Sequence, residues 1–130
     1  FPASDAGGSQ AQITPEINLD YLYTLTGSDE VLQAKIMQVM LTETPRDLEK
    51  LKNALAGSDW DGVRAAAHKM KSGLQYLGLN DIVALAKDIE LSAKEKTQLH
   101  LLEGKINTVL LSCESGLLQL QTAFEKIQQK

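Results

Sequence analysis

The sequence predicts an all-α fold, an antiparallel four-helix bundle with a short additional N-terminal helix. Apolar residues recur at steps of three and four from Ile17 almost to the end of the chain, which is the spacing of amphipathic helices. Only three prolines occur, and two of them lie in the first 15 residues. The single Asp-Gly pair, at 61–62, lies inside a helical pattern, so nothing predicts a hairpin. A chain of 130 residues with these features is expected to form one domain around one shared core.

Residues 1–15 differ in composition from the rest of the chain. They are mainly Gly, Ser, Ala, Gln and Pro and show little apolar periodicity. We interpret them as a flexible linker or an expression remnant, and we place the bundle in residues 16–130. Because the chain begins at Phe1 rather than at a methionine, we expect it to be a piece of a larger protein or a processed product.

The first two predicted helices are bounded by residues that favour helix ends. A short helix over residues 19–25 is expected to stop at Gly27, and Ser28 is expected to cap the next helix, whose first turn then holds two acids. Pro45 leaves two alternatives open, because Thr44 and Pro45 either start a new helix or lie inside a long, kinked one. The buried stripe of this region is predicted to consist of Leu32, Ile36, Val39, Met40, Leu48, Leu51 and Leu55.

Two shorter helices are predicted to follow. Ser58 and Asp61 have the spacing of a capping box, so a third helix is expected from there to about Leu77, with Gly78 ending it. Asn80 or Asp81 is expected to cap the fourth helix. The buried face of that helix is predicted to consist of Ile82, Leu85, Ala86, Ile89 and Ala93.

A long final helix is predicted after the polar turn at residues 94–97. Its wide apolar stripe is typical of a helix packed in a bundle rather than in a two-stranded coil. At 1.5 Å per residue, about 30 residues span roughly 45 Å. The stripe consists of Leu99, Leu102, Ile106, Val109, Cys113, Leu120 and Ile127, with Leu110, Leu117 and Phe124 beside it.

Composition and charge argue against several classes of function. A formal net charge of −4 gives no electrostatic reason to expect binding to nucleic acid. No apolar run approaches the roughly 20 residues of a membrane span, so no membrane contact is expected of this domain. Cys113 is the single cysteine, which favours a reducing, cytoplasmic location, and we expect it to be a small core residue.

One predicted helix carries distinctive chemistry on its exposed face. His68 lies roughly 130° around the third predicted helix from the centre of the apolar stripe, so it is expected to point into solvent. Small residues lie one helical turn away on both sides, and an ammonium lies beside it. The stripe consists of Trp60, Val63, Ala67, Met70, Leu74 and Leu77. The neighbours of His68 on its own face are Arg64, Ala65, Lys71, Ser72 and Gln75.

This face suits the transfer of a phosphoryl group between proteins. An accessible imidazole is a nucleophile that is partly neutral near pH 7. Lys71 is placed to neutralise phosphoryl oxygens, and Gln75 could donate a hydrogen bond to the same group. The alternative, which the chemistry of the residues leaves open, is an ordinary surface histidine.

The same segment resembles a known family. Residues 67–73, Ala-His-Lys-Met-Lys-Ser-Gly, followed by Leu-Gly-Leu at 77–79, look like the signature of histidine-containing phosphotransfer (HPt) domains of bacterial phosphorelays. That signature has an apolar residue two positions after the histidine, then lysine, two small residues and a glycine ten positions after it. Those places are filled here by Met70, Lys71, Ser72, Gly73 and Gly78. Many members have glycine where this chain has Ser72, which is a minor departure. The resemblance extends over residues 17–93.

The resemblance implies a phosphocarrier rather than an enzyme. His68 would accept a phosphoryl group from the aspartate of a response-regulator receiver domain or from a histidine kinase core. The sequence does not fix which ring nitrogen carries it, and we expect Nε2, the atom farther from the backbone. It would then pass the group to the aspartate of another receiver. The receivers would dock over Arg64, Ala65, Ser72 and Gly73. No cofactor of the domain's own is implied, because the receiver supplies the acidic pocket and the Mg²⁺, and we expect a monomer.

Two other interpretations stay open. The chain could be a helical docking module that binds receiver domains without carrying phosphate, although the presence of His68 argues against it. It could also be the C-terminal, phosphorylatable part of a hybrid sensor histidine kinase, with residues 1–15 as its linker. His100 is expected to be an ordinary helix residue and Lys69 to be solvated.

Overall fold

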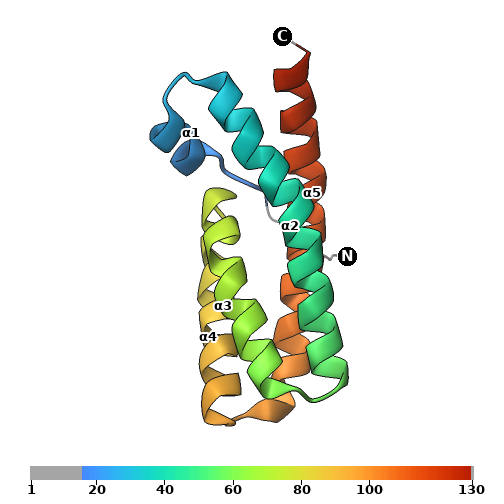
Figure 1. The fold of residues 1–130 in the computed structure, drawn as a ribbon. Coiled ribbons are helices and arrows are strands. Elements are labelled where there is room, and N and C mark those ends of the chain that lie inside the picture. The colour runs from blue at the N-terminus through green and yellow to red at the C-terminus, as the bar shows by residue number, and fades with distance from the viewer. Residues whose placement is uncertain (1–15, 130) are drawn as a thin grey trace, which may run out of the picture.

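The computed structural model describes residues 16–129, and all regular structure in that range is helical. Four helices, α2 to α5, run antiparallel in chain order as a bundle (Figure 1), and α1 lies beside the beginning of α2. The predicted all-α bundle with a short additional helix is therefore confirmed, whereas the linker predicted for residues 1–15 lies outside the described residues. The elements are α1 (Asp20–Thr26), α2 (Glu30–Ala56), α3 (Trp60–Tyr76), α4 (Asn80–Glu95), the 3-10 turn η2 (Leu99–Leu101) and α5 (Leu102–Gln128).

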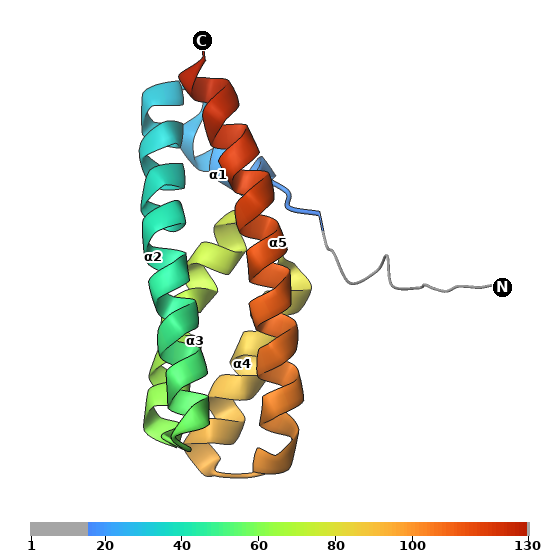
Figure 2. The same cartoon turned by 90° about the vertical axis from the view of Figure 1, so that its right-hand side faces the viewer.

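The helices differ in length, so α2 and α5 continue beyond α3 and α4 at one end of the molecule. α2 and α5 have 27 residues each, whereas α3 has 17 and α4 has 16. The first turns of α2 and the last turns of α5 therefore extend past the ends of α3 and α4 (Figure 2), and α1 lies next to this extension. At 1.5 Å per residue α5 spans about 40 Å, somewhat less than expected, because η2 takes its predicted first residues.

The core is formed by apolar side chains from all four long helices. The predicted stripe of α3 is confirmed, since its members are buried except for Trp60, which is half-buried. The predicted face of α4 is also confirmed, with Leu85 only partly buried. The largest fully buried side chains are Leu22, Met37, Leu51, Val63, Leu74, Leu77, Ile89, Leu102, Ile106, Val109, Cys113 and Leu120.

The predicted buried stripe of α2 is wrong at two positions of its first half, whereas Met40 is buried and Ile36 partly buried as predicted. Leu32 and Val39 are 40% and 58% exposed, whereas Met37 is fully buried. Gln33 is also buried, because its Nε2 donates a hydrogen bond to the backbone oxygen of Gly27 at 2.9 Å. A polar side chain with such a partner can face inward, and the apolar pattern alone does not reveal it.

α2 continues through Pro45 as one helix, which decides between the two alternatives that the sequence left open. Thr44 is buried inside the helix and does not cap a new one. Proline lacks the backbone N–H that would bond to the carbonyl one turn earlier, but the ring is compatible with helical φ. Leu48 and Leu51 beyond it are buried as predicted, and Leu55 is partly buried.

Aspartates cap α2 and α3, so the predicted serine caps are wrong. The side chain of Asp29 accepts a hydrogen bond from the backbone N–H of Leu32, and that of Asp59 accepts one from Gly62, both at 3.0 Å. Ser58 has a φ of 51°, outside the extended range of a capping residue. α4 begins after Leu79 without a side-chain cap, because Asn80 and Asp81 already lie in its first turn.

The turn between α3 and α4 is fixed by the segment that precedes α1. Asn18 donates its backbone N–H to the carbonyl of Leu77 at 2.8 Å. Gly78 adopts a φ of +71°, and a Cβ added there would meet the Asn18 carbonyl oxygen. Only glycine combines that conformation with so close a backbone approach. The end of α3 is thereby anchored to the N-terminal part of the described chain.

Candidate functional site

His68 projects from the middle of α3, on the face turned away from the core. Its side chain is 66% exposed, whereas its helix neighbours Ala67 and Met70 are buried. The exposure that the helical spacing predicted is confirmed. An imidazole in this position is accessible to another protein.

Glu90 of α4 connects His68 with Lys71. Its Oε2 lies 2.8 Å from Nδ1 of His68, and its Oε1 lies 2.7 Å from Nζ of Lys71. Nothing in the helical spacing assigns a role to Glu90, because it lies 22 positions from His68 on another helix. Its position directly after the buried Ile89 is the sequence signal that would place Glu90 at the margin of the buried face of α4. The histidine and the lysine are therefore brought together through a carboxylate as well as by helical spacing.

The charge on Glu90 determines which nitrogen of His68 carries the hydrogen. The pKa of Glu90 is lowered, first because Lys71 donates a hydrogen bond and also because His68 does, and these effects outweigh the opposing effect of burial. An ionised carboxylate only accepts hydrogen bonds, so the hydrogen in the contact with His68 belongs to Nδ1. In the neutral imidazole the free lone pair then lies on Nε2, which leaves Nε2 as the nucleophilic atom.

The other predicted site residues lie along the same helix. Arg64, Ala65 and Ser72 are exposed one turn from His68, as expected. Gly73 is half-buried and faces α2, since a Cβ there would lie 3.7 Å from Thr44 Oγ1. Gln75 is exposed but lines a separate hollow of about 270 Å³ at the junction with α1. The structure thus groups Lys71 with His68 and places Gln75 at the end of the same face.

Lys69 is 52% exposed, in agreement with the expectation of a solvated side chain, and it also pairs with acids of α2. Its Nζ lies 3.0 Å from Asp47 Oδ1 and 3.4 Å from Glu43 Oε1. The contact with Asp47, followed by that with Glu43, raises the pKa of Lys69. Asp47 is buried, so this pair joins α3 to α2 on one side of His68, while Glu90 joins α3 to α4 on the other.

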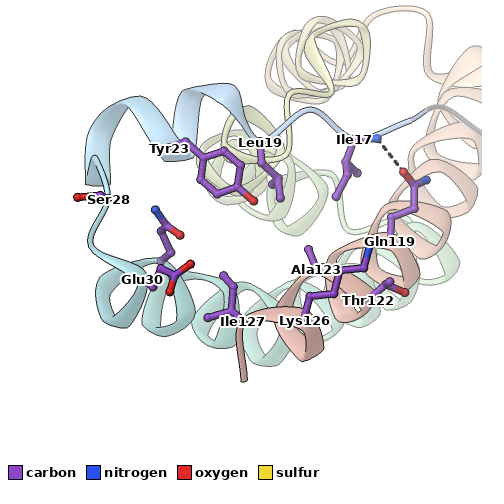
Figure 3. A pocket seen from close by; sticks show the side chains of 11 residues that line it. Ile17, Leu19, Tyr23, Ser28, Glu30, Gln119, Thr122, Ala123, Lys126 and Ile127 are labelled. Atoms are coloured by element: carbon purple, nitrogen blue, oxygen red, sulfur yellow. Dashed lines mark hydrogen bonds between the residues drawn. The ribbon is translucent and has the colours of Figure 1, made fainter. Parts of the chain in front are cut away.

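Two hollows lie outside the contact between His68 and Glu90. One, of about 470 Å³, runs between α2 and α3 and has small side chains in its wall. It is lined by Asp47, Lys50, Asn53, Ala54, Asp59, Gly62, Ala65, Ala66 and Lys69. The other, of about 740 Å³, opens between α1, α2 and α5 (Figure 3). Ile17, Leu19 and Tyr23 form one wall, and Ala123, Lys126 and Ile127 of α5 form the facing one. Of these two, the first adjoins the face of α3 that carries His68, through Ala65 and Lys69.

Neither a metal centre nor a membrane span emerges from the described part of the chain. Within residues 16–129, no group of three or more His, Cys, Asp or Glu side chains could hold a metal ion. None of the helices in that range is long and apolar enough to cross a bilayer. His100, the other histidine of the chain, is exposed in η2.

Comparison with known proteins gives one match. A family model described as the Hpt domain matches residues 35–130. The matched range contains His68, Lys71 and Glu90 and leaves out α1 and the first turn of α2. No curated protein and no solved structure matches the chain.

Proposed function

The chain belongs to the Hpt domain family, whose members transfer phosphoryl groups in His-Asp phosphorelays, and from that premise we propose that His68 is its phosphoacceptor. The observation that carries the proposal is the 2.8 Å contact between Nδ1 of the exposed His68 and the ionised Glu90. It keeps the Nε2 lone pair available without a separate general base.

The transfer step follows from this tautomer. The Nε2 lone pair attacks the phosphorus of an aspartyl phosphate on a docked receiver domain. The new N–P bond forms while the P–O bond to the aspartate breaks, and the electron pair of that bond leaves with the carboxylate. Nδ1 keeps its hydrogen throughout, and the resulting imidazolium is stabilised by the charge of Glu90. The reverse of this step delivers the group to the aspartate of a second receiver, while a kinase core is an alternative donor.

Lys71 is the proposed cation for the phosphoryl group. It lies one helical turn after His68, is 25% exposed, and reaches the Glu90 oxygen that His68 does not contact. A phosphoryl group on Nε2 would compete with Glu90 for its ammonium, which neutralises charge that builds up during transfer. Gln75, two turns along the same face, is proposed as a second hydrogen-bond donor once a receiver is docked.

The receiver is proposed to dock on the face that surrounds His68. Arg64, Ala65 and Ser72 flank the histidine and are exposed, and two of them are small enough to let another protein approach closely. Gly73 lies at the edge of this face, toward α2. The divalent metal of the reaction is proposed to come from the receiver, and the domain to act as a monomer. We further propose that it works in the cytoplasm, as part of a hybrid histidine kinase.

Intact-mass measurement tests the proposal. The protein is mixed with a panel of phosphorylated receiver domains and Mg²⁺, with the His68→Gln variant in parallel. We expect one acid-labile phosphoryl group on the wild type and none on the variant, with unchanged helical content. If the wild type binds receivers but gains no phosphoryl group from any of them, the domain is a docking module and the proposal is wrong.

A further inference from the structure

We propose that Glu90 retains the Nδ1 proton on His68 after phosphorylation and thereby shortens the lifetime of the phosphohistidine. This inference rests on the proposed phosphorylation of His68 at Nε2. It concerns the stored phosphoryl group, and it makes Glu90 a positioning residue whose effect appears most clearly when the group leaves.

The chemistry of departure depends on the Nδ1 proton. When water or a receiver carboxylate attacks phosphorus, the P–Nε2 bond breaks and its electron pair returns to Nε2. If Nδ1 holds a proton, the ring leaves as a neutral imidazole with its hydrogen still on Nδ1. If Nδ1 has lost that proton, the ring must leave as an imidazolate anion, which is a much poorer leaving group. A carboxylate that keeps this proton on Nδ1 therefore favours release of the phosphoryl group.

The contacts around His68 favour retention of this proton. Glu90 touches Nδ1 directly, at 2.8 Å, and its side chain is only 21% exposed, which reduces the screening of its charge by water. Lys71 binds the other carboxylate oxygen. A phosphoryl group that attracts Lys71 away from Glu90 would therefore strengthen the interaction of the carboxylate with the proton on Nδ1.

Cations near the site act in the opposite direction. Arg64 and Lys71 lie one turn from His68 on α3, while Lys87 and Lys94 lie one turn from Glu90 on α4. All four favour loss of the proton, but among them only Lys71 has a contact with Glu90, and none has a contact with the imidazole. The direct anionic contact is therefore expected to determine the state of Nδ1.

The experiment measures spontaneous loss of the phosphoryl group in the absence of any receiver. The whole protein is phosphorylated with phosphoramidate, a small chemical donor, the donor is removed, and the remaining phosphoprotein is followed by intact mass from pH 6 to 9. The variants are Glu90→Gln and, as a matched control, Glu43→Gln, since Glu43 contacts Lys69 and Arg46 instead of His68. We expect Glu90→Gln to lengthen the lifetime at pH 7.5 about threefold, the size of a charge contact in which one partner, here the imidazole, is exposed to solvent. We expect Glu43→Gln to leave the lifetime unchanged.

The pH profile and the nitrogen chemical shifts distinguish the outcomes. We expect the rise of the lifetime with pH to occur at lower pH in Glu90→Gln, and ¹⁵N shifts to show a protonated Nδ1 in the wild-type phosphoprotein at pH 7.5. An identical lifetime profile for the wild type and Glu90→Gln would overturn the inference. So would an unprotonated Nδ1 in the wild type, and this second measurement decides the matter if the variant takes up no phosphoryl group. Absence of label at His68 in the wild type would instead contradict the proposed function itself.

Discussion

Nδ1 of His68 lies 2.8 Å from Oε2 of Glu90, across the contact between α3 and α4. The other oxygen of the same carboxylate binds Lys71, so three charged or ionisable groups from two helices form one unit. Because the helices are fixed by a shared core, the imidazole is oriented before any partner arrives. In the proposed transfer, this preorganisation would lower the entropic cost of bringing the imidazole to the phosphorus atom.

Replacing Lys71 tests whether its ammonium assists the transfer. Lys71→Ala removes a cation one turn from His68, and we expect the rate of phosphoryl transfer from a receiver to fall about tenfold without being abolished. The loss should be smaller than the hundredfold or more that follows removal of a buried oxyanion donor, because Lys71 is partly exposed. Single-turnover kinetics with a phosphorylated receiver measure the effect.

The matched control is Lys105→Ala, which removes a lysine paired with Asp88 between α4 and α5. We expect it to transfer at the wild-type rate. Equal rates for Lys71→Ala and the wild type would show that the ammonium has no electrostatic role in the reaction.

Gly78 is expected to be the most sensitive glycine in the described part of the chain. A Cβ added there would clash with the Asn18 carbonyl oxygen, in a backbone conformation with φ of +71°. We expect Gly78→Ala to lower the free energy of unfolding by about 2–4 kcal/mol. Gly27→Ala separates the two causes, since Gly27 has φ of +62° but nothing within 4 Å, and it should cost about 1 kcal/mol. Urea unfolding curves compare them, and equal losses would rule out the steric clash.

The observed burial along α2 can be checked by truncating two of its side chains. Met37 is fully buried and Leu32 is 40% exposed. We expect Met37→Ala to lower the free energy of unfolding by about 2–5 kcal/mol and Leu32→Ala by less than about 1 kcal/mol. A larger loss for Leu32→Ala would favour the stripe that the sequence pattern predicted.

Cys113 is expected to make the stability depend on pH in the alkaline range. Burial, with a smaller contribution from the charge of Glu114, raises the pKa of the Cys113 thiol to about 12. The folded state then favours the neutral thiol, so the stability this adds is complete below pH 9, the ordinary value, and is lost as the pH rises toward 12.

The comparison variant is Cys113→Val, which has a similar volume and no ionisable group. We expect the free energy of unfolding of the wild type to fall, relative to this variant, by at most about 1.4 kcal/mol per pH unit above pH 9. A constant difference between pH 8 and pH 11 would mean that the thiol ionises as easily in the folded protein as in the unfolded one.

Much of this fold follows from local sequence patterns. The periodicity of α3 and α4 places their buried faces correctly, because the inner and outer sides of these helices differ clearly in polarity. The first half of α2 is different. It is covered by α1, and Gln33 is buried there through a hydrogen bond to Gly27, so the true inner face is less apolar than a face containing Leu32 and Val39.

The candidate site shows a similar division. Helical spacing on one element is enough to place Lys71 and Ser72 beside His68 and to predict its exposure. Glu90 and the partners of Lys69 come from other helices, and their contacts depend on how α2, α3 and α4 pack. Spacing along the chain carries no information on those distances, so neither contact could be predicted from it.

We propose that Nε2 of His68 carries the phosphoryl group. The most direct test is ³¹P–¹⁵N correlation NMR of the phosphorylated protein, with His68→Gln and His100→Gln as a matched pair, since the chain has only these two histidines. We expect a phosphoryl group on Nε2 in the wild type and in His100→Gln, and no signal in His68→Gln. A phosphoryl group on Nδ1 of His68, or one that persists in His68→Gln, would contradict it.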